Sequence, residues 1–259
     1  MKIVAFFKIS IVFSLIFLFL GLSGLLRFFI SDHYRLQIYR TKLQSILCRW
    51  GLRVLSVEVK AIGSCPPADE ARLMVGNHMS YLDVLILCSL YSSSYVTSQE
   101  IRETFFLGML CDWAGCLFVE RRNRSNLSRE VLDITEALKA GQKVTIFPEA
   151  TSTNGEEVLR FRAPLYQSAM DANLSVQAFC LNYLKINGVP FHKGNRDFVC
   201  WYGDMSFLPH LWALCLCRSI EVSVEFFEPL TAADYSEPKA LAQVTQYLVA
   251  TKFIPVATI

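Results

Sequence analysis

The sequence carries almost no net charge. Its 25 lysine and arginine residues nearly balance 23 aspartate and glutamate residues, which leaves a formal charge of +2 at pH 7. Proteins that bind nucleic acid usually carry a clear basic excess, so no nucleic-acid partner is expected. With 53% hydrophobic and 19% charged residues the chain is too apolar to be disordered, and its 259 residues suffice for one large domain and a membrane element.

Recognisable metal and nucleophile motifs are missing as well. The nine cysteines form no C-x-x-C pair and no Cys/His ligand spacing, so we expect mostly buried, reduced thiols and no metal site. A zinc or disulfide role stays open for Cys215 and Cys217 in their apolar run. The G-x-S-x-G sequence of serine hydrolases does not occur, which argues against a lipase or thioesterase. Internal repeats and low-complexity stretches are also lacking.

An uncharged apolar run, Ile9–Leu26, lies near the N-terminus. Its 18 residues would form a helix of roughly 27 Å, just enough to cross a bilayer core of roughly 30 Å. Two lysines precede it, whereas six basic residues follow, which predicts that the rest of the chain faces the cytoplasm: Arg27, Arg35, Arg40, Lys42, Arg49 and Arg53. A cleaved signal peptide is the alternative, but apolar residues continue to Ile30. A shallow or re-entrant helix pair also stays open.

The next segment, Tyr34–Trp50, has apolar residues at helical spacing between basic ones. This pattern predicts an amphipathic helix, which lies either in the headgroup layer of a membrane or packed on the domain. We therefore divide the chain into a membrane anchor with an interfacial helix, residues 1–50, and a second domain, residues 51–259.

Beyond Gly51, short apolar or β-branched runs alternate with helical patterns. One clear helix is Ser128–Ala140, which ends before Gly141. The alternation predicts an α/β fold with a mixed, largely parallel sheet flanked by helices. The predicted strands are Val54–Ala61, Arg72–Gly76, Ser94–Thr97, Cys116–Val119, Lys143–Phe147, Val176–Leu181, Asp197–Cys200 and Ile220–Phe226.

The first stretch with candidate chemistry, residues 77–83, follows a predicted strand and precedes the apolar helix Val84–Leu90. Ser80 and Asp83 have the spacing of a helix capping box, which explains both residues without any function. It does not explain His78. On one straight helix His78 and Asp83 would point roughly 140° apart, but in a turn that folds back they can meet. The carboxylate would then hold the imidazole while the other ring nitrogen takes a proton from a hydroxyl.

Two further stretches end predicted strands with polar residues. Residues 115–122 run from a strand into a basic turn with Arg121 and Arg122 that continues with Arg124 and Arg129. This basic run is either a solvated face or an anion site. Residues 147–155 begin with a proline that stops a strand, followed by Glu149 and turn-forming residues. Glu149 would pair with a nearby arginine, a contact that either is structural or positions a substrate, and Arg160 and Arg162 are further candidates for anion contacts.

Taken together and in this order, the three stretches resemble the glycerolipid acyltransferase family that includes the 1-acylglycerol-3-phosphate acyltransferases. The family's H-x-x-x-x-D motif is similar to His78 and Asp83, and its F-x-x-R element to Phe118 through Arg121. Its F-P-E-G-[TS] element is similar to Phe147 through Thr151. The resemblance spans roughly residues 70–185.

The resemblance implies that His78 is the general base, assisted by Asp83, and that the hydroxyl attacks a thioester of acyl carrier protein or coenzyme A without an acyl-enzyme. This thioester is a co-substrate, and no cofactor is implied. Membrane lipids and a lysolipid acceptor are the implied partners, on the cytoplasmic face of the inner membrane. The implied substrate-binding residues are Asn77, Ser80, Phe118, Arg121, Glu149, Ala150 and Thr151.

Two departures from the family pattern bear on the acceptor. Ala150 stands where the family usually has glycine, and Ser152 where members that form phosphatidic acid often have arginine. A fourth element of the family, usually a valine-proline pair at a strand end, is similar to residues 176–179, which contain no proline. Residues 201–212 are similar to a segment of the bacterial branch that acylates lyso-ornithine lipid, or are a helix-entry turn with aromatic anchors. The acceptor is therefore expected to be lyso-ornithine lipid or a lysophospholipid. The alternatives are a non-catalytic membrane protein and a lipid hydrolase or thioesterase.

Overall fold

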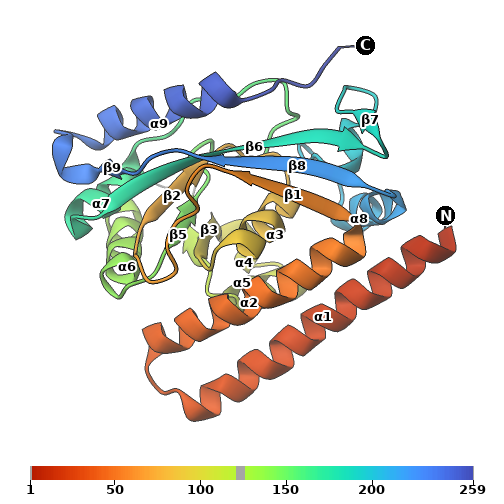
Figure 1. Cartoon of the computed structure of the whole chain (residues 1–259). Helices are drawn as coiled ribbons and strands as arrows, with labels where there is room; N and C mark the ends of the chain where they lie inside the picture. Colours follow the sequence, from red (N-terminus) through yellow and green to blue (C-terminus); the bar gives the residue numbers. More distant parts are fainter. Residues whose placement is uncertain (1, 121–125, 259) are drawn as a thin grey trace.

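Helices and strands alternate through the chain after residue 56 (Figure 1). The computed structural model describes residues 2–120 and 126–258. The helices are α1 (Lys2–Phe29), α2 (His33–Leu55), α3 (Tyr81–Leu90), α4 (Gln99–Arg102), α5 (Phe105–Trp113), α6 (Leu127–Lys139), α7 (Gln167–Ala172), α8 (Phe207–Leu216) and α9 (Pro238–Lys252), with short 3-10 helices η2 (Pro164–Tyr166), η3 (Arg196–Phe198) and η4 (Ala232–Asp234). The strands are β1 (Val57–Ile62), β2 (Leu73–Gly76), β3 (Ser94–Ser98), β4 (Leu117–Val119), β5 (Val144–Ile146), β6 (Ser175–Ile186), β7 (Val189–Pro190), β8 (Ile220–Phe226) and β9 (Leu230–Thr231).

The strands form one mixed sheet in the order β1-β8-β6-β2-β5-β3-β4, and β7 and β9 also pair with β6. Neighbouring strands are parallel except that β6 runs antiparallel to β7, β8 and β9. The predicted α/β fold with a largely parallel sheet is confirmed. Because β2, β5, β3 and β4 run in one direction, the chain segments that follow them meet at a single edge of the sheet.

Each face of the sheet has its own core. Alternate residues of a strand point to opposite faces. Met74 and Leu181 therefore pack with α2, α3 and α8, whereas Leu73 and Val75 pack with α6, α7 and α9. Figure 1 shows α9 on one side of the sheet and α2 and α3 on the other. Burial on both faces explains why the central strands are almost entirely apolar in sequence.

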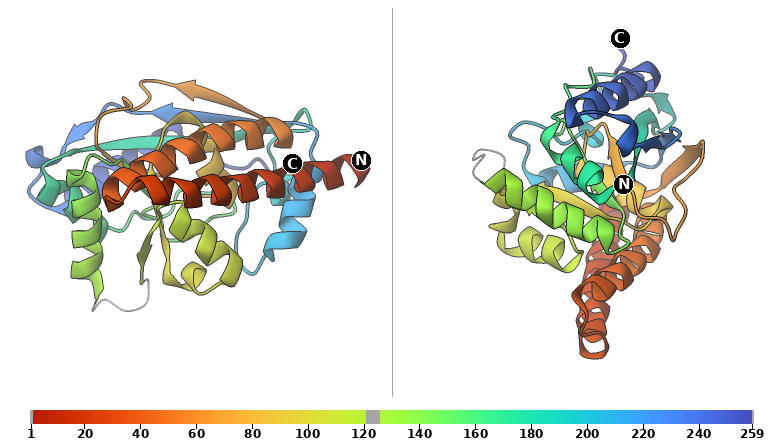
Figure 2. Two further views of the ribbon diagram at one scale, coloured as in Figure 1. Left: turned by 90° about the horizontal axis from the view of Figure 1, so that it is seen from below. Right: turned by 90° about the vertical axis from the view of Figure 1, so that its left-hand side faces the viewer.

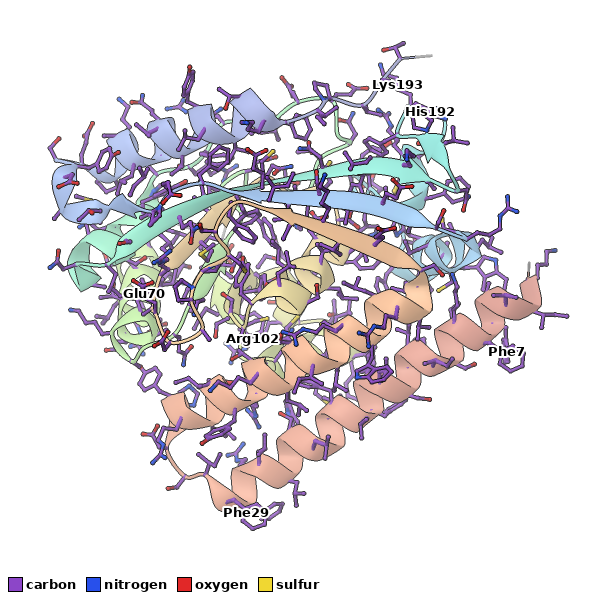
Figure 3. The ribbon with its side chains drawn as sticks, in the orientation of Figure 1. Phe7, Phe29, Glu70, Arg102, His192 and Lys193 are labelled. Carbon is purple, nitrogen blue, oxygen red and sulfur yellow. The ribbon has the colours of Figure 1, made fainter. Side chains whose placement is uncertain are left out.

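The helices α1 and α2 form an antiparallel hairpin along one side of the domain, and they lie side by side in Figures 1 and 2. Among the described residues, α1 is the helix long and apolar enough to cross a membrane by length and composition, and 17% of its apolar window is buried. Figure 3 shows Phe7 and Phe29 on the side of α1 away from the domain. The predicted apolar helix is present and extends beyond Ile9–Leu26 at both ends.

A buried lysine joins α1 to the ends of two other helices. The Lys8 ammonium donates hydrogen bonds to the carbonyl oxygens of Leu55 and Cys217, at 3.4 and 2.7 Å, and to Ser56 Oγ at 3.1 Å. Leu55 ends α2 and Cys217 caps the C-terminus of α8, so the cation lies where both helix dipoles are negative. Because a buried ammonium without partners is strongly unfavourable, these contacts hold α1 against the domain.

The predicted start of the first strand, Val54, is wrong. Helix α2 continues through Gly51 to Leu55, and β1 begins at Val57. Leu52 and Leu55 follow one another at helical spacing and pack into the core, which outweighs the roughly 1 kcal/mol cost of an interior glycine. The domain boundary predicted between residues 50 and 51 therefore falls inside α2.

The predicted strand Asp197–Cys200 is also wrong, since this segment contains η3 instead. The N–H groups of Val199 and Cys200 donate to the carbonyl oxygen of Arg196, at 3.0 and 2.8 Å. These local hydrogen bonds leave no partner for a strand ladder. Val199 and Cys200 are fully buried, so the apolar pattern indicated burial and not an extended conformation.

Candidate active site

The turn that carries His78 is attached to the sheet by its first residue. Asn77 follows β2, and its side-chain amide pairs with the backbone of Leu181 in β6: Nδ2 donates to the carbonyl oxygen and Oδ1 accepts from the N–H, both at 2.8 Å. The preceding Gly76 leaves space for the ring and carbonyl of Phe179, which a Cβ would approach to 2.3 and 2.5 Å. Both contacts fix the direction in which the chain leaves the sheet.

The predicted capping box at the start of α3 is confirmed. The Ser80 hydroxyl accepts a hydrogen bond from Leu82 N at 3.2 Å, and Asp83 Oδ2 accepts from Ser80 N at 2.8 Å and from Met79 N at 2.6 Å. Ser80 and Asp83 are both fully buried. Two backbone amides thus hold the carboxylate on the inner side of the turn, where it faces His78.

His78 and Asp83 are in direct contact. His78 Nδ1 lies 2.9 Å from Asp83 Oδ2. Because an ionised carboxylate only accepts hydrogen bonds, Nδ1 carries the proton and Nε2 is the basic nitrogen of the neutral ring. Nε2 has no hydrogen-bond partner among the described residues, and the side chain is 18% exposed. The ring stacks on Phe147 at a centroid distance of 3.9 Å and an interplanar angle of 14°, which fixes its plane.

The loop after β5 lies beside this turn. Thr153 N donates to the carbonyl oxygen of His78 at 2.9 Å, and Arg162 N donates to that of Pro148 at 2.9 Å. Ala150 has a φ of +59°, a left-handed conformation that costs a residue other than glycine roughly 1–2 kcal/mol. The loop keeps this strained alanine where the resembled family usually has glycine.

Residues after η3 complete the site, and sequence reasoning gave them no place beside His78. Trp201 N donates to the carbonyl oxygen of Met79 at 2.8 Å, and the Ser152 hydroxyl donates to the carbonyl oxygen of Trp201 at 2.5 Å. The Tyr81 hydroxyl lies 2.9 Å from Nδ1 of the buried His210 in α8. The loop after β5, the segment after η3 and helix α8 therefore all contact the turn and the start of α3. The aromatic residues within 201–212 were the feature of the sequence that could have indicated these contacts.

Glu149 is buried beside this turn without a hydrogen-bond partner for either carboxyl oxygen among the described residues. Burial raises its pKa from the ordinary value of 4.5 to about 8, and the nearby main-chain N–H groups of His78 and Leu159, which do not reach hydrogen-bond geometry, oppose this only in part. The expected ion pair with an arginine is not formed within the described part of the chain. The physical reason is that Arg160 and Arg162 are exposed whereas Glu149 is not.

This raised pKa predicts a pH-dependent stability. The folded protein keeps the Glu149 proton that the unfolded chain releases above pH 4.5, so stability falls as the pH rises from about 4.5 to about 8. The slope contributed by this group reaches up to about 1.4 kcal/mol per pH unit. Glu149→Gln should flatten the curve, as measured by urea unfolding at several pH values. The exposed Glu157→Gln is the matched control, and equal slopes for wild type and Glu149→Gln would contradict the prediction.

Thr151 and Phe118 make no hydrogen bond or ring contact with His78 in the described part of the chain. Thr151 is exposed at the surface of the loop. Phe118 is in β4, three strand spacings or about 14 Å from β2 across the sheet. The Arg102 guanidinium, labelled in Figure 3, lies 5.0 Å from the centre of the Phe118 ring. Arg121 lies outside the described residues.

An open pocket of about 300 Å³ adjoins the loop after β5. Thr153, whose N–H is bonded to the His78 carbonyl oxygen, connects the pocket with the imidazole turn. Polar and acidic side chains dominate its lining: Ser152, Thr153, Asn154, Glu156, Glu157, Leu159, Tyr202 and Gly203. The polar pocket therefore shares one lining residue, Thr153, with the contacts of the turn that carries His78, and His78 itself is not part of the lining.

Comparisons with known proteins identify the family. A family model described as Acyltransferase matches residues 57–182. The chain is 31% identical to the lyso-ornithine lipid O-acyltransferase of Pseudomonas aeruginosa, with 80% of this chain and 78% of the relative covered. It is 30% identical to the 1-acyl-sn-glycerol-3-phosphate acyltransferase of Neisseria meningitidis, with 75% and 74% covered.

The fold agrees with these matches. The crystal structure of the 1-acyl-sn-glycerophosphate acyltransferase PlsC from Thermotoga maritima superposes with a TM-score of 0.70 at 17% identity, covering 97% of this chain and 95% of that one. The chain is an acyltransferase. It belongs to the acyltransferase family, in which its relatives are acyltransferases named for lysolipid substrates.

Proposed function

We propose that this acyltransferase moves a fatty acyl group from an acyl thioester to the hydroxyl of a lysolipid. The contact between His78 and Asp83 carries the proposal, because it leaves Nε2 as the ring nitrogen that can accept a proton, on a side chain that is 18% exposed. The names of the relatives support the substrate class, since they include lyso-ornithine lipid and 1-acyl-sn-glycerol-3-phosphate acyltransferases.

In the proposed reaction His78 Nε2 removes the proton of the acceptor hydroxyl, and the oxygen attacks the thioester carbonyl carbon. Asp83 stabilises the resulting imidazolium through the Nδ1–H hydrogen bond. The tetrahedral intermediate then collapses, the carbon–sulfur bond breaks, and the thiolate takes the proton from His78. The products are an ester and a free thiol, with no covalent acyl-enzyme. The donor is acyl carrier protein or coenzyme A carrying the acyl group, and the mechanism needs no other cofactor.

The seven residues that the family resemblance assigns to substrate binding would act in different ways. Exposed Thr151 and the segment that carries Phe118 and Arg121 would contact the headgroup directly. Asn77 and Ser80 are buried and would act by shaping the turn. Glu149 and Ala150 would act by holding the loop beside it.

The pocket beside Ser152 favours a zwitterionic headgroup over a phosphate monoester. Glu156 pairs with Arg196 at 2.8 Å and with Lys193 at 3.2 Å, and Glu157 adds a second carboxylate to the lining. An ornithine joined through its α-amino group keeps one ammonium and one carboxylate, which match these mixed charges. A phosphate dianion would be repelled by the carboxylates and would lack an arginine at position 152. We therefore propose lyso-ornithine lipid as the preferred acceptor.

We also propose attachment to the cytoplasmic face of the inner membrane through α1. Its exposed apolar side chains would enter the lipid, and the basic residues of α2 would meet anionic headgroups. Contacts of α1 with α2, α5 and α8, together with the Lys8 hydrogen bonds, support a helix that lies along the membrane surface. A span perpendicular to the membrane would have to draw these neighbours into the lipid.

The test is acyl transfer by the purified protein in detergent. Palmitoyl-acyl carrier protein and palmitoyl-coenzyme A are each supplied with lyso-ornithine lipid or with 1-acylglycerol-3-phosphate, and the lipid products are measured by mass spectrometry. We expect an esterified product, with kcat/KM about tenfold higher for lyso-ornithine lipid, a difference of about 1.4 kcal/mol. Preference for the phosphate acceptor would overturn the acceptor proposal. Release of free fatty acid without ester formation would indicate a hydrolase instead.

A further inference from the structure

The carboxylate that holds His78 has a second buried partner from the centre of the sheet. The Tyr183 hydroxyl, on β6, donates a hydrogen bond of 2.7 Å to Asp83 Oδ1. The other oxygen, Oδ2, accepts from Met79 N, Ser80 N and His78 Nδ1. The two oxygens therefore have separate donors, and Tyr183 is the one described residue that holds Oδ1.

Within the described part of the chain, the Tyr183 hydroxyl forms its single hydrogen bond with Asp83. Tyr183 is 1% exposed, and its hydroxyl forms no other hydrogen bond within the described part of the chain. Its ring packs on Phe191 at a centroid distance of 5.8 Å, a contact that phenylalanine would make equally well. Burial and the neighbouring Asp83 charge raise the pKa of Tyr183 well above its ordinary value, so the hydroxyl stays a donor.

We propose that Tyr183 is a positioning residue for acyl transfer: its hydroxyl fixes the rotation of the Asp83 carboxylate and so aims His78 at the acceptor hydroxyl. This proposal rests on the general-base role of His78 given above. The backbone amides and the imidazole all contact Oδ2, which lies off the Cβ–Cγ axis, so they already limit rotation of the carboxylate about that bond. The Tyr183 hydroxyl adds the one described restraint on Oδ1, which fixes the carboxylate plane at both oxygens and disperses part of the negative charge.

The contact joins two parts of the sheet that the fold already aligns. Asn77 pairs with Leu181, two residues before Tyr183, so the turn and β6 are held in register. Tyr183 and Leu181 point to the same face of the sheet, as residues two apart on a strand do. The same pairing that directs His78 out of the sheet therefore brings the hydroxyl beneath Asp83.

The first test is Tyr183→Phe, which removes the hydroxyl and keeps the ring. Without this donor Asp83 carries more charge toward the imidazolium, so the apparent pKa of the general base should rise. We expect kcat to fall about tenfold with KM within about twofold of wild type, and the acid limb of the pH profile of kcat/KM to move to higher pH.

Tyr166→Phe is a matched control from the other face of the sheet. Tyr166 is fully buried, and its hydroxyl lies 2.7 Å from Thr245 Oγ1. Both variants lose one buried hydrogen bond and should melt a few degrees lower. Tyr166→Phe should leave kcat and the pH profile unchanged. Tyr183→Phe, like this control, lowers the melting temperature on either interpretation. If it leaves kcat and the pH profile unchanged, Tyr183 is structural and the proposal is overturned.

Two further measurements keep the proposal testable if Tyr183→Phe does not fold or if the acceptors fail. Incorporation of 3-fluorotyrosine at position 183 strengthens the donor at almost constant volume and should move the acid limb to lower pH. An unmoved limb would overturn the proposal. The His78 Nδ1–H proton, observed by NMR, should change its chemical shift in either variant whether or not lysolipid is acylated. If the Nδ1–H chemical shift changes but no acyl transfer is detected, the proposed function is rejected and the coupling of Tyr183 to His78 is supported. If acyl transfer is detected but the chemical shift does not change, the positioning role of Tyr183 is rejected.

Discussion

Replacement of His78 by alanine is expected to reduce kcat/KM for acyl transfer by at least about 1,000-fold. His78 is the described imidazole in contact with Asp83, and its Nε2 is the ring nitrogen left to accept a proton on a side chain that is 18% exposed. Without it the acceptor hydroxyl, whose proton is held tightly near neutral pH, has no base to remove that proton. Initial rates with an acyl thioester and a lysolipid measure the effect.

The fold should survive this substitution. Asp83 keeps its hydrogen bonds from Met79 N, Ser80 N and Tyr183 Oη, so the carboxylate is not left without partners. His192→Ala is a suitable control, because His192 lies at the far end of β6 near the C-terminal segment (Figure 3). It should change kcat/KM by less than about twofold. Retention of a tenth or more of the activity by His78→Ala would refute the general-base mechanism.

The sequence predicted the active-site turn well because its determinants are local. A capping serine and aspartate three residues apart define the start of α3, and the histidine two residues before the serine must then lie over that start. Some strand ends also followed from local patterns, since β2 ends at Gly76 and β5 ends two residues before Pro148. The predicted end at Leu181 was wrong, because β6 continues to Ile186. The relation of His78 to Asp83 was thus contained in a few consecutive residues.

Contacts that depend on strand pairing were not predicted. Tyr183 is 100 residues away from Asp83 in sequence, and a tyrosine in a strand is ordinary by itself. It reaches Asp83 because β2 lies beside β6 in a register that the sequence does not reveal. The contact of Trp201 with Met79 was not predicted for a similar reason, since residues 201–212 were singled out but were expected to follow a strand and instead follow η3. The partner of Glu149 was expected from charge alone, but burial separates it from the nearby arginines.

Replacement of Asp83 by asparagine is expected to reduce kcat/KM by about 100-fold to 10,000-fold while the protein stays folded. The amide oxygen can take the place of Oδ2 and accept from Met79 N, Ser80 N and His78 Nδ1–H. The amide nitrogen then faces the Tyr183 hydroxyl, which can turn to accept. The ring therefore keeps its tautomer and its direction, and the missing charge alone should slow the reaction.

Comparison with Asp83→Leu separates charge from structure. Leucine leaves two backbone amides and the Tyr183 hydroxyl buried without an acceptor, at about 1–3 kcal/mol for each unsatisfied group. We expect this variant to be poorly folded, as shown by thermal denaturation, whereas Asp83→Asn should unfold close to wild type. Full activity in Asp83→Asn would mean that the carboxylate only caps α3 and orients the ring. A large loss of activity with little loss of stability would mean that its charge supports the imidazolium as the acyl group moves.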